Sequence, residues 1–179
     1  MPIVYLGLGT NLGDREAHLR EAVRRLDEAG VHVTALSPLY ETAPVGYLDQ
    51  PDFLNAVCRA ECQLPPHDLL RVVKGIEAAL GRRPSFRNAP RPVDIDILFY
   101  DDRVLDTPDL VIPHPRLAER AFVLVPLTDL APEFVHPVLG HIIADLLTAV
   151  DRASVHPYGP HFGIPQSAIA TSQSAITLP

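Results

Sequence analysis

The 179-residue chain contains no tryptophan, one methionine and only two cysteines. If Cys58 and Cys62 lie on one strand, they are roughly 13 Å apart, which is too far for a disulfide. A single C-x₃-C sequence without a second pair is also a poor zinc site. We therefore interpret both residues as thiols of the core or surface, and we expect a reducing, cytoplasmic environment.

Long apolar runs are missing too, since none approaches the ~20 residues that a membrane-spanning helix needs. The first six residues are apolar and uncharged, which is typical of a strand rather than of a signal peptide. The net charge is −7, with 22 acidic and 15 basic residues, and this balance argues against a non-specific nucleic-acid binder. We expect no membrane or nucleic-acid partner, and a monomer.

The sequence also lacks a G-x₄-G-K-[ST] motif, so any ATP must be bound without a P-loop. The glycines of residues 7–13, GLGTNLG, follow a predicted strand, but their spacing is G-x-G-x-x-x-G and no acid lies near position 33. A tight turn from strand to helix is therefore favoured over a dinucleotide site.

The most informative stretch that is present runs from Arg91 to Tyr100, RPVDIDILFY. Its period of two predicts a strand with Val93, Ile95, Ile97 and Phe99 on one face, and Asp94, Asp96, Leu98 and Tyr100 on the other. The two carboxylates then lie roughly 6–7 Å apart along one face. Their oxygens can converge on a pair of Mg²⁺ ions, which lie roughly 3.5–4 Å apart in two-metal sites.

Four arginines precede these acids, namely Arg82, Arg83, Arg87 and Arg91. A loop rich in cations that leads into a strand with two acids suits a metal–polyphosphate ligand. The alternative is an exposed edge strand whose acids serve solubility alone.

The remaining pattern predicts an α+β fold. We expect strands over residues 2–8, 31–39 and 92–100, another from residue 53, and helices over 14–30 and 65–81. This order is β-α-β-β-α-β, the ferredoxin-like arrangement of a mostly antiparallel sheet with helices on one face. Further helices are predicted at 115–130 and 140–150. We expect one domain over residues 1–150 and a flexible tail over 151–179, where prolines and glycines interrupt any apolar pattern.

Three further groups of residues are candidates for binding. Phe53 and Asn55 share a strand face and suit a flat heterocycle that is recognised along its edge, although a core phenylalanine and a strand-end asparagine are the simpler interpretation. His114 lies in a rigid Pro-His-Pro turn, where a lone histidine is more often structural. Arg116 and Arg120 lie one helical turn apart and suit phosphates or simply a solvated face.

Five motifs occur in register and carry a resemblance to a known family. They are GTNLG at 9–13, TAPVG at 42–46, DQPDFLNA at 49–56, RPVDIDI at 91–97 and IPHPR at 112–116. Together they are similar to 6-hydroxymethyl-7,8-dihydropterin pyrophosphokinase, an enzyme of folate synthesis, from the first strand to about residue 140.

The resemblance implies a Mg²⁺-dependent transfer of the β,γ-pyrophosphoryl group of ATP to the pterin hydroxymethyl oxygen, with release of AMP. It implies that Asp94 and Asp96 hold two Mg²⁺ ions, and that Arg82, Arg91 and Asp96 are catalytic. The implied pterin contacts are Thr42, Pro44, Val45, Phe53, Asn55 and Phe122. The implied ATP contacts are Lys74, Glu77, Arg82, Arg91, Ile97, His114, Arg116 and Arg120.

The chain departs from the family pattern in one loop and one turn. The family often has a tryptophan near Asn88, and this chain has none. Asp109 and Val111 stand where some members have an arginine and a threonine, and Pro115 stands where some have an aromatic residue. None of these positions touches the acid pair.

Two other classes of function remain open from the residues alone. A ferredoxin-like domain that only binds a small molecule is one, because the fold does not fix function. A metal nuclease is the other, and the acidic charge balance disfavours it.

Overall fold

The computed structural model describes residues 1–159, whose strands form a six-stranded sheet and a small hairpin. The sheet runs in the order β5 (Asp94–Tyr100), β1 (Ile3–Thr10), β4 (Phe53–Cys62), β3 (Tyr40–Thr42) and β8 (Val155–Pro157), and β2 (Val31–Leu36) also pairs with β4. Every one of these pairings is antiparallel. The hairpin joins β6 (Leu105–Asp106) to β7 (Val111–Ile112).

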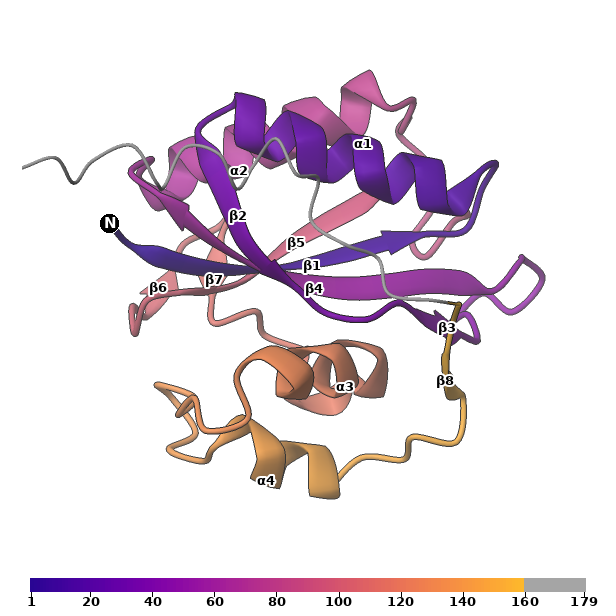
Figure 1. The fold of residues 1–179 in the computed structure, drawn as a ribbon. Helices are drawn as coiled ribbons and strands as arrows, with labels where there is room; N and C mark the ends of the chain where they lie inside the picture. Colours follow the sequence, from indigo (N-terminus) through magenta and orange to yellow (C-terminus); the bar gives the residue numbers. More distant parts are fainter. Residues whose placement is uncertain (160–179) are drawn as a thin grey trace, which may run out of the picture.

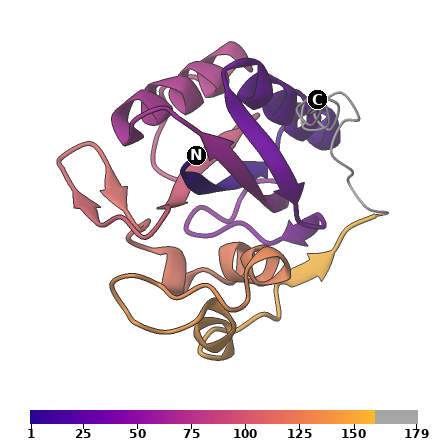
Figure 2. The ribbon, with the colours of Figure 1, turned by 60° about the vertical axis from the view of Figure 1, so that its left-hand side comes forward.

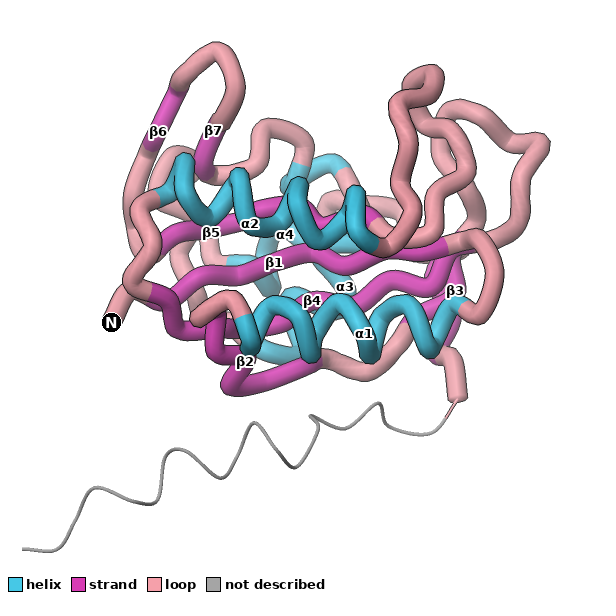
Figure 3. The backbone as a smooth tube through the Cα atoms, turned by 90° about the horizontal axis from the view of Figure 1, so that it is seen from above, coloured by secondary structure: helices cyan, strands magenta, loops and turns pink. Residues whose placement is uncertain are grey.

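Helices cover both faces of this sheet (Figure 1). On one face α1 (Arg15–Glu28) and α2 (Pro66–Ala79) lie side by side, as seen from above in Figure 3. On the other face lie α3 (Ala121–Leu130) and α4 (Ile143–Thr148), after a short 3₁₀ helix at Leu117–Glu119. No helix in residues 1–159 is long and apolar enough to cross a membrane.

The ends of the first two helices follow from local sequence signals. The Asp14 carboxylate accepts a hydrogen bond from the Ala17 amide and so caps α1, and Gly30, with φ of 81°, follows its last turn. Pro66 opens α2, where a proline costs no helical hydrogen bond. The predicted ferredoxin-like order is confirmed, and the predicted C-terminal helices cover the face that the first two leave open.

The acid strand β5 contains a bulge that the sequence pattern did not indicate. Leu6 pairs with Ile97 and Tyr5 pairs with Phe99, so Leu98 is the extra residue. Tyr100 therefore joins the core under α1 and α2, and Phe99 joins the core under α3, the reverse of the faces predicted for these two aromatic residues. Asp94 and Asp96 precede the bulge and keep their common face.

The segment predicted as a flexible tail, 151–179, includes a strand that the sequence pattern did not indicate. β8 lies in this segment and pairs with β3 along the edge of the sheet, where Figure 2 shows it in yellow. The Tyr158 amide also donates to the Leu39 carbonyl at 2.9 Å. A three-residue strand that contains a proline has no detectable alternation, and backbone pairing is what fixes it. The rest of the predicted tail, 160–179, lies outside the described residues.

Candidate active site

Two pockets meet at the N-terminal end of β5. The first is lined by Thr42, Val45, Phe53, Asn55 and Phe122, and the second by Lys74, Glu77, Arg82 and residues of the loop that joins α2 to β5. The second has a volume of about 570 Å³, within the range of small-molecule sites. Both pockets share Asp94, Asp96, Arg91, Arg120 and Asn88. The acid pair therefore lies on the boundary between the two pockets.

The first pocket combines two aromatic rings with a buried amide. Phe53 and Asn55 come from one face of β4, as predicted, and Phe122 comes from the start of α3. The Asn55 amide nitrogen donates to the Thr42 hydroxyl at 2.6 Å, and both side chains are buried. Gly9 on the neighbouring strand leaves room for this amide, because a Cβ there would lie 2.8 Å from the Asn55 oxygen. This arrangement fixes the direction of a polar group beside aromatic surfaces.

Two arginines connect these rings to the acids. The Arg91 guanidinium lies 5.1 Å from the centre of the Phe53 ring, and its Nη2 is 3.1 Å from Asp94 Oδ2. The Arg120 guanidinium lies 5.5 Å from the Phe122 ring and its Nη1 is 3.9 Å from Asp96 Oδ2. Both distances from guanidinium to ring are within the range of cation–π interactions.

The two carboxylates differ in how well they are neutralised. Burial raises the pKa of Asp94, but Arg91 and Arg82 outweigh it, so this pKa lies below its ordinary value. Burial, together with the charge of Asp94, raises the pKa of Asp96 to about 6. Arg120 Nη1 lies 3.9 Å from Asp96 Oδ2 and His114 Nε2 lies 4.0 Å from the same oxygen, so neither group makes a close contact with it. The negative charge of the Asp96 carboxylate is therefore only partly neutralised, so this group can bind a further cation.

Glu77 joins the second pocket to the edge of the sheet. Its Oε1 accepts from the Ile95 amide at 2.7 Å, which satisfies a donor on the edge strand β5. The same carboxylate pairs with Arg82 at 2.8 Å and with Lys74 at 3.0 Å. Burial raises the pKa of Glu77, against the Ile95 amide and the two cations. Glu77 therefore positions both cations beside the pocket.

His114 is neutral at pH 7. Burial and the nearby Arg120 lower the pKa of His114 to about 4. Its Nδ1 accepts from the Arg116 amide at 3.2 Å, so Nε2 carries the proton and is the donor in the second pocket. This geometry suits a phosphate oxygen.

Asn11 is a structurally important residue that the sequence analysis missed. Its oxygen accepts from the Arg91 amide at 2.9 Å, and its amide nitrogen donates to Gln50 Oε1 at 2.8 Å and to the Pro51 carbonyl at 2.9 Å. It therefore joins the segments before β4 and β5. An asparagine directly after a buried strand was the available signal, but the GTNLG motif indicated only a turn.

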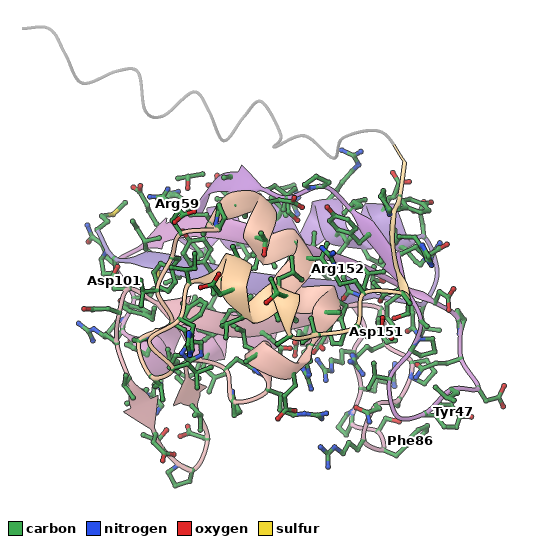
Figure 4. All side chains as sticks on the ribbon, turned by 90° about the horizontal axis from the view of Figure 1, so that it is seen from below. Tyr47, Arg59, Phe86, Asp101, Asp151 and Arg152 are labelled. Carbon is green, nitrogen blue, oxygen red and sulfur yellow. The ribbon has the colours of Figure 1, made fainter. Side chains whose placement is uncertain are left out.

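Two loops touch above the site: the 43–52 loop, between β3 and β4, and the 80–93 loop, between α2 and β5. Tyr47 and Phe86 meet edge to face, with ring centres 5.1 Å apart (Figure 4). Gln50 Nε2 donates to the Asn88 carbonyl at 2.9 Å. The absence of a side chain at Gly46 makes room for the side-chain amide of Asn88, because a Cβ at Gly46 would lie 2.3 Å from Asn88 Nδ2. Asn88 thus joins the two loops.

The other predicted residues are placed as follows. Ile97 is buried in the core under α1 and α2, and neither Ile97 nor Pro44 lines either of these two pockets. Arg116 lines the first pocket rather than the second, His114 lines the second, and Arg120 lines both. Their contacts with substrate remain predictions.

Comparison with known proteins gives one family. Residues 5–132 match the sequence model of the 7,8-dihydro-6-hydroxymethylpterin-pyrophosphokinase (HPPK) family. The 2-amino-4-hydroxy-6-hydroxymethyldihydropteridine pyrophosphokinase of Bacillus subtilis is 46% identical over 132 residues, which cover 73% of this chain and 79% of that protein.

Longer relatives match over only part of their length. The folic acid synthesis protein FOL1 of Dictyostelium discoideum is 40% identical over 97% of this chain and 26% of its own length. The chain spans about a quarter of such relatives. Among solved structures, Plasmodium falciparum HPPK-DHPS superposes with a TM-score of 0.66 at 20% identity, covering 83% of this chain and 41% of that one. This likeness supports the fold.

Proposed function

The chain belongs to the 7,8-dihydro-6-hydroxymethylpterin-pyrophosphokinase family, and from that premise we propose that it transfers the β,γ-pyrophosphoryl group of ATP to the hydroxymethyl oxygen of 6-hydroxymethyl-7,8-dihydropterin. The products are the pterin diphosphate and AMP. The observation that carries the proposal is the position of Asp94 and Asp96, which line an aromatic pocket and a cationic pocket at once.

The first pocket suits the pterin. Its ring would lie against Phe53 and Phe122, whose faces offer stacking surface. Asn55, held by Thr42, would bind the polar edge of the heterocycle, where an amide can both donate and accept. A substrate in this pocket would present its hydroxymethyl group toward the acids on the pocket boundary.

The second pocket suits a triphosphate. Its lining includes the cations Lys74, Arg82, Arg83, Arg87, Arg91 and Arg120. His114 adds a neutral donor. In phosphoryl transfer the protein contributes mainly position and charge neutralisation, and guanidinium groups are well suited to both tasks. Arg82 and Arg91 already contact Asp94, so they lie close to where the transferring group would be.

Asp94 and Asp96 fit Mg²⁺ bound together with phosphates. Among residues 1–159 no group of three or more His, Cys, Asp or Glu side chains forms a metal site, so phosphate oxygens and water would complete the coordination. The negative charge of Asp96 is only partly neutralised by Arg120, and this supports such an arrangement. We infer two ions, which when bound would neutralise the triphosphate and orient its oxygens.

The direct test is AMP production by the purified full chain. With ATP, Mg²⁺ and the dihydropterin alcohol, AMP and pterin diphosphate should form in equal amounts, and EDTA should abolish both. A domain that only binds small molecules would release no AMP. AMP formation that does not require the pterin would instead indicate ATP hydrolysis and would contradict the assignment of the aromatic pocket.

We also propose a cytoplasmic monomer that binds neither nucleic acid nor membrane. The net charge of −7 supports the absence of nucleic-acid binding. Light scattering of the purified protein and cell fractionation would test the oligomeric state and the location.

A further inference from the structure

We propose that Arg15 and Tyr158 are positioning residues for the aromatic pocket, acting from outside it through β3. The proposal rests on the assignment of this pocket to the pterin. Neither residue lines the two pockets described above. Together with β8 they form a clamp on the β3–β4 wall that carries Thr42 and Asn55.

Arg15 joins three segments that are distant in the sequence. Its Nη1 donates to the Asp52 carbonyl at 2.9 Å, next to the first residue of β4. Its Nη2 lies 2.7 Å from Glu41 Oε2, in the middle of β3. Its guanidinium also lies 5.4 Å from the ring centre of Tyr158, directly after β8. One planar group with several donors can hold all three segments at once.

β8 supports β3 from the side that β4 leaves open. Within the ladder Thr42 stands opposite Phe53 on β4 and opposite Val155 on β8. The Ala43 amide donates to the Ser154 carbonyl at 3.4 Å, and the Tyr158 amide donates to the Leu39 carbonyl at 2.9 Å. A strand of three residues has little stability of its own, so pairing on both sides matters for its position.

The clamp reaches the substrate pocket through β3, whose Thr42 lines the pocket and bonds to Asn55. Thr42 Oγ1 accepts from Asn55 Nδ2, and this contact orients the amide that would bind the pterin edge. If β3 moves, the amide loses its orientation while the acids on β5 stay in place, because β5 pairs with β1 on the far side of β4. Loss of one well-oriented hydrogen bond to a ligand weakens its binding by up to about tenfold.

The clamp includes residues that follow the part of the chain covered by the family model. The matched residues are 5–132, whereas β8 and Tyr158 follow them.

The test compares Arg15→Ala and Tyr158→Ala with two controls in the full chain. Arg24→Ala removes another arginine of α1, which pairs with Glu21 and Glu28 away from the clamp. Tyr158→Phe retains the ring that faces Arg15. We expect the KM for dihydropterin to rise about tenfold in the two alanine variants, with the KM for ATP unchanged and both controls like wild type. Equal pterin KM values in all variants, or an equal rise in both KM values, would overturn the proposal.

A second measurement needs no ligand. Hydrogen exchange of the amides at residues 40–43 should be faster in Arg15→Ala than in Arg24→Ala, while exchange in β5 stays unchanged. Unchanged exchange at 40–43 would also overturn the clamp. If wild type binds no dihydropterin, the proposed function fails, and the exchange experiment still decides whether Arg15 holds β3.

Discussion

The site is built from two kinds of support, strands and loops. Asp94 and Asp96 lie on β5, opposite Gly9 and Gly7 of β1, and their backbone is fixed by the ladder. Arg82 and Asn88 instead lie in the 80–93 loop, where Phe86 is 59% exposed. We therefore expect the strands to keep their groups in place, and the loops to move their groups when a substrate binds and when product leaves. Substitutions on the strand should consequently reduce activity more than substitutions in the loops.

The largest effect is expected on the strand. Asp94→Asn or Asp96→Asn retains the shape but deletes a charged oxygen ligand, so turnover at saturating Mg²⁺ should fall by roughly a thousandfold. Steady-state AMP formation measures this loss, and circular dichroism should show an unchanged fold. Rates like those of wild type in either variant would contradict the assignment of these residues to the metals.

The next effect is expected on the loop side of the comparison. Arg82 follows α2 and contacts both Glu77 and Asp94. If its guanidinium acts mainly in the transition state, Arg82→Ala should slow the chemical step by about a hundredfold, with ATP affinity nearly unchanged. Single-turnover kinetics separate the chemical step from product release. A variant that matched wild type in a single turnover would show that Arg82 has only a structural role.

The same contrast explains what the sequence could predict. Asp94 and Asp96 could be placed on one face because the strand period depends on neighbours alone. The contacts of Asn11 with Gln50 and Arg91 join segments 39 and 80 residues apart, and no local pattern encodes them. The bulge at Leu98 depends on the register with β1, so the faces of Phe99 and Tyr100 were predicted the wrong way round.

β8 was missed for a related reason. Its pairing with β3 is made by backbone groups, which differ little between residue types other than proline, so the side chains of Val155–Pro157 show little of it. The pockets follow the same rule: Phe53 and Asn55 share a strand and could be paired in advance, whereas Phe122 reaches them only through the packing of α3. Motif resemblance, rather than periodicity, brought Phe122 into the predicted site.

A smaller effect is expected where the two loops touch. The contact between Tyr47 and Phe86 resembles aromatic pairs worth about 0.5–1.5 kcal/mol. Tyr47→Ala and Phe86→Ala should each change the KM of the dihydropterin or of ATP about two- to tenfold, and the double variant should add little. Additive effects would show that the rings act separately.

Hydrogen exchange at residues 82–90 should slow when both substrates bind, and equal exchange with and without them would exclude loop closure.

The smallest effect is on stability, and it has the opposite sign to the effect on activity. In the ligand-free protein, burial and Asp94 raise the pKa of Asp96 to about 6, so its ionised form destabilises the fold at pH 7. Asp96→Asn should therefore raise the melting temperature by a few degrees at pH 7. Below about pH 4 the carboxyl is protonated in both the folded and the unfolded chain, so this gain should shrink as the pH falls from 7 toward 4. Thermal unfolding without Mg²⁺ or nucleotide, at pH 7 and at pH 4, measures the difference. A gain in melting temperature that stays constant with pH, or a loss at pH 7, would show that the ionised Asp96 carboxylate does not destabilise the fold.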